Sequence, residues 1–238
     1  MVKKNFRYPF GLLFREVSDM TTYDYLKYLQ HDIHTVVVAM VDDDGVPVTC
    51  AVDIMDYDDG GLYFLTAKGK SFYNRLAKCG SIALTGIKGK DTLHAVAVSV
   101  RGNVQEIGNS RLPQIFAKNP YMKKIYPTVE SQKALTVFKL YEGTGEWFNL
   151  SKKPIERASF SIGSMKPKPE GYYIAADVCI GCHRCENVCP QGCIDFKNVS
   201  AKILQENCLH CGNCWNACPV GAVKKAGESA HRQQEHPF

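Results

Sequence analysis

The sequence CIGCHRCENVCP, residues 179–190, has a second copy that begins 29 residues later, CLHCGNCWNACP, residues 208–219. Each copy spaces its cysteines as C-x2-C-x2-C-x3-C and closes on a proline. We call these motifs the first and second ladders. Together they contain eight of the 11 cysteines of the chain. Thiols repeated at this spacing indicate metal or redox chemistry rather than disulfides.

Composition places the ladders in an ordinary folded protein. The chain has 238 residues, of which 45% are hydrophobic and 22% charged, values typical of a folded globular protein. Its apolar runs are too short to span a membrane. Arg15 and Glu16 interrupt the apolar start too early for a signal peptide. Free cysteines belong to reducing compartments, so we expect a cytoplasmic protein without a membrane span.

The ladder spacing has a specific meaning for iron–sulfur chemistry. Three closely spaced thiolates bind one 4Fe-4S cluster from a single loop, and the fourth cysteine of each ladder binds the other cluster. Structural zinc is the alternative. Zinc needs four ligands per ion, however, and it has no use for a third cysteine two residues further on or for the C-P ending. The sequence therefore predicts two 4Fe-4S clusters. The expected ligands are Cys179, Cys182, Cys185 and Cys218 for the first cluster, and Cys208, Cys211, Cys214 and Cys189 for the second.

The 29-residue repeat extends beyond the cysteines. In the repeat Ile174 aligns with Ile203 and Ile194 with Val223, so each half predicts a short strand, a cluster loop and a one-turn helix that begins near the proline. Here the sequence resembles the two-cluster bacterial ferredoxins. We expect this domain at residues 172–227, a connector at 164–171 and a tail at 228–238. Cys193 corresponds to Ala222 in the repeat and is expected to be a small buried residue, not a ligand.

Charge gives little indication of a partner. The formal net charge is +5, but each oxidised cluster carries about −2, which removes most of the excess. No block of lysine and arginine is long enough to favour nucleic acid. We therefore expect no nucleic-acid partner.

Residues 1–163 contain many strand patterns separated by turns. HTVVVAMV and VPVTCAVDIM flank an Asp-Gly turn, and LYFLTA, GSIALTGI, TLHAVAVSVRGNVQEI and LTVFKLYEGTGEWFNL follow. Helical patterns are fewer: SDMTTYDYLKYLQ, KSFYNRLAK and SRLPQIFAKNPYMKKIY, the last broken near Pro120. The pattern predicts a mostly β domain built as an antiparallel barrel.

This order of strands, with GLYFLTAKGKSFYNRLAK between them, resembles the pyridoxamine-5′-phosphate-oxidase-like family over residues 14–163. The resemblance implies an FMN-binding split β-barrel, usually a homodimer with flavin at the subunit interface. It also implies that two strand segments flank the flavin, with backbone groups offered to the isoalloxazine edge. Related barrels bind FAD or F420, which are less favoured here. The segments correspond to Cys50, Ala51, Val52 and Asp53, and to Leu65 and Thr66.

The phosphate of FMN needs cations and hydrogen-bond donors. Thr66, Lys68, Lys70 and Ser71 provide them just before a predicted helix, whose N-terminus favours anions. The alternative is a solvated, lysine-rich turn after a strand. The stretch DIMDYDDG is acidic where the oxidase itself binds a substrate phosphate, so we do not expect pyridoxamine-phosphate oxidation.

These features predict an iron–sulfur flavoprotein reductase. Single electrons would pass from a redox partner through two clusters to FMN and on to an unidentified small acceptor. The alternatives are a non-catalytic electron-transfer adaptor that docks on a larger redox complex, and a flavin-binding protein with a purely structural cysteine domain. No catalytic acid, base or nucleophile is identified, because the flavin would supply the chemistry.

Overall fold

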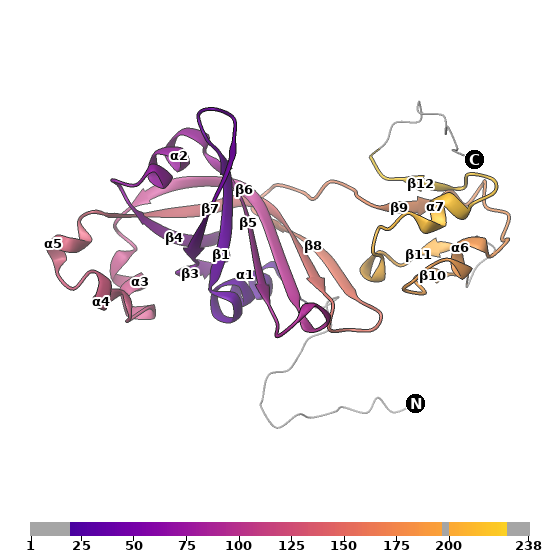
Figure 1. Cartoon of the computed structure of the whole chain (residues 1–238), viewed down its shortest axis with the longest axis horizontal. Helices are drawn as coiled ribbons and strands as arrows, with labels where there is room; N and C mark the ends of the chain where they lie inside the picture. The colour runs from indigo at the N-terminus through magenta and orange to yellow at the C-terminus, as the bar shows by residue number, and fades with distance from the viewer. Residues whose placement is uncertain (1–19, 197–199, 228–238) are drawn as a thin grey trace, which may run out of the picture.

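The computed structural model describes residues 20–196 and 200–227. The predicted tail and the first nineteen residues, with Arg15 and Glu16, lie outside this part. Figure 1 shows two bodies, a β-rich domain and a smaller cysteine-rich domain, joined by a single extended segment. Within the described residues, no helix is both long and apolar enough to cross a bilayer.

The β-rich domain is one antiparallel sheet of eight strands. Its strands follow the order β2-β1-β5-β6-β7-β4-β3, and β8 pairs with β7. The strand bounds are β1 Thr35–Val41, β2 Pro47–Asp53, β3 Asp56–Asp58, β4 Gly61–Ala67, β5 Ser81–Lys88, β6 Val96–Gly108, β7 Leu135–Asn149 and β8 Glu156–Ile162. The predicted mostly β, antiparallel fold of this domain is confirmed.

The sheet separates a core face from an outer face by simple alternation. On β1, Val36, Val38 and Met40 are buried, whereas Val37 and Val41 are about half exposed. Side chains on a strand alternate between the two faces of its sheet, so the alternation on β1 shows which of its side chains face the core. The outer face carries small or apolar residues on neighbouring strands, because Val37 pairs with both Ala51 and Thr85.

Helices close the core at several points. Their bounds are α1 Thr22–Tyr28, a π-helix at Leu29–Ile33, α2 Ser71–Cys79, a 3-10 turn at Thr92–His94, α3 Leu112–Lys118, α4 Met122–Ile125 and α5 Val129–Gln132. The patterns for α1 and α2 correctly predicted helices, and the break between α3 and α4 falls beside Pro120. The first predicted helix continues as a π-helix over Leu29–Ile33. Two predictions were wrong in detail. Thr92–His94 form a 3-10 turn rather than the start of the following strand. The short helices of the two ladders, Arg184–Asn187 and Asn213–Ala217, end before the prolines instead of beginning near them, because they carry the third cysteine of each ladder.

The cysteine-rich domain is built from two interlocked halves. Its elements are β9 Tyr172–Ile174, α6 Arg184–Asn187, β10 Ile194–Asp195, β11 Lys202–Ile203, a 3-10 turn at Gln205–Asn207, α7 Asn213–Ala217 and β12 Val223–Lys225. Ile194 pairs with Ile203, and Ile174 pairs with Val223. The second pairing joins the first strand of one repeat to the last strand of the other. Neither half is complete alone, as expected for an intertwined repeat.

Candidate functional site

The first predicted ligand set lines one cavity. Cys179, Cys182, Cys185 and Cys218 all border this cavity. Three of them come from the first ladder and the fourth from the end of the second. The structure therefore brings together the four residues that the spacing predicted, across the two halves of the repeat.

The second set lines an equivalent cavity. Cys208, Cys211 and Cys214 come from the second ladder, and Cys189 closes the set from the first. Cys193 also borders this cavity, with its Sγ 3.4 Å from Sγ of Cys189. It is 3% exposed, so the structure buries Cys193 as the sequence predicted.

Backbone amides point at the sulfur atoms in equivalent places. The N–H of Cys193 donates to Sγ of Cys189 at 3.4 Å, and the N–H of Ala222 donates to Sγ of Cys218 at 3.1 Å. Burial opposes ionisation of both thiols, but the surrounding N–H groups prevail and lower the pKa of Cys189 and of Cys218. These amides favour thiolates, the form that binds metal.

The donor set of each cavity fits a 4Fe-4S cluster. Each cavity is bordered by three cysteines of one ladder and the fourth cysteine of the other, and this is the ligand set that two-cluster ladders provide for each cubane.

The predicted flavin residues of β2 divide between the two faces of the sheet. Val52 is buried and Cys50 packs against the core, whereas Ala51 and Asp53 face outward. Among the described strands, β2 lies at one end of the sheet path and pairs only with β1. A strand at the end of a sheet has unpaired N–H and C=O groups on one side, and these groups can form hydrogen bonds with the polar edge of a ligand.

Leu65 and Thr66 lie on β4 and point to different layers. Leu65 packs against the hydrophobic cluster under α3, whereas Thr66 is 4% exposed. The hydroxyl of Thr66 is buried and has no hydrogen-bond partner within the described part of the chain. A buried hydroxyl without a partner is unfavourable by about 1–3 kcal/mol, so Thr66 fits a site that a polar ligand completes.

The lysines near the start of α2 have different environments. Nζ of Lys68 lies 3.5 Å from Oε1 of Glu106, whose carboxylate also accepts from Thr136 and Tyr73. Lys68 is therefore already neutralised. Lys70 is the N-cap residue of α2 and Ser71 its first residue, with no side-chain cap. Lys70 and Ser71 thus remain the better candidates for an anion.

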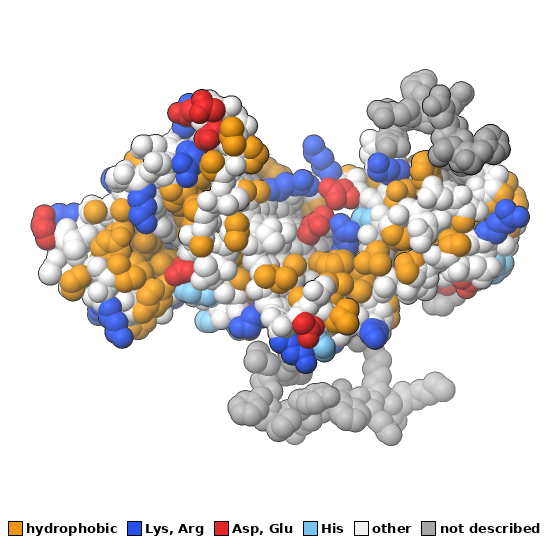
Figure 2. All heavy atoms as spheres, viewed as in Figure 1, with side chains coloured by type: hydrophobic (Ala, Val, Ile, Leu, Met, Phe, Trp, Pro, Cys, Tyr) orange, Lys and Arg blue, Asp and Glu red, His pale blue; other side chains and the backbone are white. Residues whose placement is uncertain are grey.

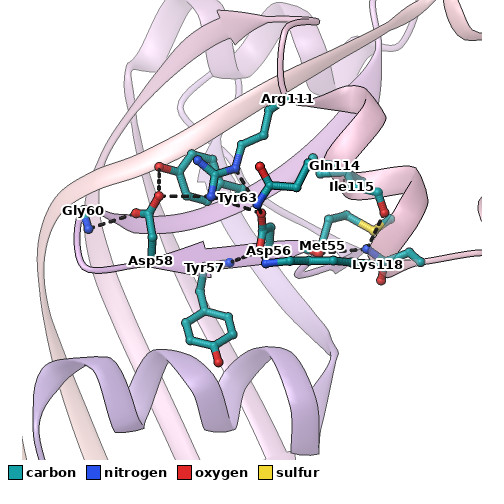
Figure 3. A network of polar contacts seen from close by, with 11 residues as sticks. Met55, Asp56, Tyr57, Asp58, Gly60, Tyr63, Arg111, Gln114, Ile115 and Lys118 are labelled. Atoms are coloured by element: carbon teal, nitrogen blue, oxygen red, sulfur yellow. Dashed lines mark hydrogen bonds and ion pairs between the residues drawn. The ribbon is translucent and has the colours of Figure 1, made fainter.

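The acidic stretch that argued against a substrate phosphate is engaged within the protein. Asp56 is fully buried and accepts from Nε of Arg111 at 3.0 Å and from Gln114 at 2.9 Å, and it also contacts Lys118. Asp58 binds Arg111 at 3.0 Å and the hydroxyl of Tyr63 at 2.8 Å. Figure 3 shows these side chains converging between β3, β4 and α3. This network holds α3 on the sheet.

Comparison with known protein families supports the two cysteine sets as cluster sites. Residues 178–222 match the family model described as 4Fe-4S dicluster domain. The predicted fold class, a mostly β split barrel followed by a ferredoxin-like domain, is confirmed. No curated protein matches the chain.

Solved structures similar to the β-rich domain have low sequence identity. A NimC/NimA family protein from Clostridium acetobutylicum is 16% identical, covering 58% of this chain and 88% of its own, with a TM-score of 0.48. A protein of the pyridoxine-phosphate oxidase family, related to general stress protein 26 and from the same organism, is 16% identical over 59% and 96%, with a TM-score of 0.46. A haem-binding protein from Mycobacterium smegmatis is 13% identical over 57% and 56%, with a TM-score of 0.45.

A polar cluster beside β2 was not predicted from the sequence. The hydroxyl of Tyr121 donates to Asp53 at 2.8 Å and lies 3.0 Å from Nε2 of His34. Burial, then the Asp53 carboxylate, raise the pKa of Tyr121. The proton of Tyr121 is directed to Asp53, and Nδ1 of His34 faces the carbonyl of Gln30 at 3.3 Å. Nε2 of His34 also lies 3.6 Å from the Asp53 carboxylate, so the three side chains form one polar cluster.

Arg75 was also missed. Its Nε is buried without a hydrogen-bond partner in the described part of the chain. Burial raises the pKa of Cys50, while Arg75 and Lys70 act in the opposite direction, which places both cations near that thiol. No local motif marks Arg75, because its relation to Cys50 arises only when α2 packs against the sheet.

Proposed function

We propose that this chain is an iron–sulfur flavoprotein oxidoreductase that passes single electrons through two 4Fe-4S clusters to FMN, for reduction of a small acceptor. The observation that supports it most is the grouping of the eight ladder cysteines into two sets of four, each around one cavity. When bound, the clusters supply single electrons and the flavin collects two for its acceptor.

Each proposed cofactor has its own residues. The sets Cys179, Cys182, Cys185, Cys218 and Cys208, Cys211, Cys214, Cys189 hold the clusters. The outer edge of β2, with Ala51 and Asp53, offers backbone groups to the flavin ring. Lys70 and Ser71 bind its phosphate at the start of α2, with Thr66 and Arg75 close to the same region. The unsatisfied hydroxyl of Thr66 and Nε of Arg75 support this assignment.

The cluster of His34, Asp53 and Tyr121 has a role in the same proposal. Two-electron reduction of an organic acceptor consumes protons as well as electrons. The imidazole of His34, the hydroxyl of Tyr121 and the carboxylate of Asp53 are groups that can exchange protons, and they lie at the end of the strand proposed to flank the flavin. The three side chains remain about one-third exposed, so solvent can return the proton.

The setting and assembly are proposed on similar grounds. All 11 cysteines are free, which supports a reducing compartment, here the cytoplasm. Val37, Val41 and Ile87 are 52%, 49% and 67% exposed on the outer face of the sheet. An exposed apolar row of this kind supports a homodimer formed through that face, with the flavin at the interface.

The proposal is tested by anaerobic purification followed by quantitation of iron, sulfide and flavin. We expect about eight irons and eight sulfides per chain and a bound FMN that is bleached by dithionite. Zinc in place of iron, or haem in place of flavin, would overturn it. A screen of small acceptors then separates a reductase from an adaptor, since an adaptor's flavin would cycle but reduce none of them.

A further inference from the structure

Ile155 of the β-rich domain is a buried contact point with the cysteine-rich domain. It lies in the connection between β7 and β8 and is 5% exposed. Its N–H donates to Oε1 of Gln191 at 3.0 Å, and its carbonyl accepts from Nδ2 of Asn207 at 2.7 Å. Both backbone groups of Ile155 are therefore satisfied by side chains of the cysteine-rich domain.

A second contact lies beside the first. Nη1 of Arg157 lies 2.8 Å from Nδ1 of His210. Arginine can only donate, so Nδ1 of His210 accepts and its proton is on Nε2. Gly171 leaves room for the ring, because a Cβ at that position would lie 2.4 Å from Nε2 of His210. Arg157 also donates to the carboxylate of Glu146 at 3.2 Å, which holds the guanidinium beside His210.

All three partner residues belong to the second cysteine set. Gln191 is two residues after Cys189, Asn207 directly precedes Cys208, and His210 directly precedes Cys211. These three side chains make hydrogen bonds to the β-rich domain, and Glu170 of the connector contacts Arg101 and Arg157. In the described part of the chain, no hydrogen bond to the β-rich domain is found at the equivalent positions around the other cavity, Val178, Val220 and Gly181.

A groove lies between the domains at this contact. Its volume is about 960 Å³, it opens to solvent, and it is bordered by Thr85 and Ser99 on the sheet and by Tyr172 and His210 on the opposite side. Figure 2 shows charged side chains of both signs gathered at this junction. Tyr172 borders both the groove and the second cysteine cavity.

The floor of the groove leads toward the proposed flavin strand. Thr85 pairs with Val37, which pairs with Ala51. Neighbouring strands lie about 4.8 Å apart, so Thr85 and Ala51 are separated by about 10 Å across one continuous face. A flavin whose ring lies along β2 can therefore approach the groove on the outer face of the sheet, without passing through the core.

We infer that the cluster held by Cys189, Cys208, Cys211 and Cys214 exchanges electrons with the β-rich domain across this groove, and that the cluster held by Cys179, Cys182, Cys185 and Cys218 is the entry point. The inference rests on the proposed function. With the clusters and the flavin bound, an external one-electron donor would deliver electrons at the entry site, and the inner site would pass them one at a time to the flavin, two for its full reduction. No covalent bond would be made or broken. Ile180, which borders the entry cavity, is 63% exposed, so that side remains open to a donor.

The repeat provides a matched test. Gln191→Ala with Asn207→Ala removes both hydrogen bonds to Ile155, and Val178→Ala with Val220→Ala changes the equivalent positions beside the entry cavity. After laser-flash reduction of the clusters, we expect flavin reduction to slow about tenfold or more in the first double variant, since each lost hydrogen bond weakens docking by roughly that factor. The second should match the wild type, with iron and flavin contents unchanged in both. Equal rates in the first variant and the wild type would overturn the inference.

Two measurements do not depend on flavin. Arg157→Gln removes a positive charge beside Cys208 and Cys211, so the potential of one cluster should fall while the other is unchanged. Hydrogen exchange over residues 205–211 should increase in the Gln191→Ala/Asn207→Ala variant and not in the valine variant. If neither the cluster potential nor the hydrogen exchange changes, the assigned order of the clusters is wrong, even when flavin is bound. If both change and no flavin is found, the contact between the domains is supported and the proposed function is wrong.

Discussion

The thiol of Cys193 lies 3.4 Å from the thiol of Cys189, although only Cys189 belongs to a ladder. The repeat explains why both are present, since Cys193 corresponds to Ala222, which is equally buried and has no thiol. Cys193→Ala should therefore retain both clusters, with iron and sulfide unchanged. Cys189→Ala should lose about half of the iron, because it removes a ligand of one cluster only. Iron loss in Cys193→Ala comparable to that in Cys189→Ala would make Cys193 a ligand.

Asp56 is expected to be the most sensitive charged residue of the β-rich domain. It is fully buried and receives Arg111, Gln114 and Lys118. Asp56→Ala leaves two cations without their buried partner and should lower the free energy of unfolding by about 3–5 kcal/mol. Urea denaturation followed by circular dichroism measures this. Cluster absorbance monitors the other domain separately.

The matched control is Asp43→Ala. Asp43 pairs with Lys78 at the surface, with its side chain 75% exposed, and exposed pairs contribute about 1 kcal/mol or less. An equal effect of the two substitutions would mean that the Asp56 network is not a stability determinant.

Local spacing predicted the cysteine-rich domain almost completely. Three ligands of each cluster lie within seven residues, and the 29-residue repeat is visible directly in the sequence. The pairing of Ile174 with Val223, which joins the two halves, was not predicted. The β-rich domain was predicted as strands and turns for a similar reason, since alternation on β1 and β5 is local. The relations that carry polar chemistry there are not local. Tyr121 reaches Asp53 across 68 residues, and no pattern in the sequence brings them together.

Lys68 shows the same limit in the predicted flavin site. The sequence presents Lys68 and Lys70 as equivalent cations in one turn. Only tertiary packing brings Glu106 from β6 to Lys68 and leaves Lys70 without it. A local motif therefore cannot show which of two neighbouring lysines is paired with a carboxylate from another strand and which is not.

Glu106 gives a pH-dependent prediction. The hydrogen bond from Thr136, at 2.6 Å, is the main cause that lowers the pKa of Glu106 below its ordinary value of 4.5. Because the folded pKa is the lower one, Glu106 stabilises the fold above about pH 4.5 and loses this contribution as the pH falls through the folded pKa. Thr136→Val should cost about 1–2 kcal/mol near pH 7, and this deficit should shrink on acidification. Urea midpoints across that range measure it, with the exposed Thr49→Val as control. A deficit independent of pH would assign the effect to packing.

The phosphate site gives the sharpest test of the flavin assignment. Lys70 and Ser71 begin α2, and Lys78 lies near its other end, paired with Asp43. If Lys70 and Ser71 hold a phosphate, the wild type should bind FMN more tightly than riboflavin, and Lys70→Ala/Ser71→Ala should lose that preference by about tenfold or more. Lys78→Ala, which removes the same charge from the same helix, should retain it, and iron content should be unchanged throughout. Fluorescence titration with both flavins measures the preference. An FMN preference that persists in the double variant would place the phosphate elsewhere, with Arg75 as the next residue to substitute.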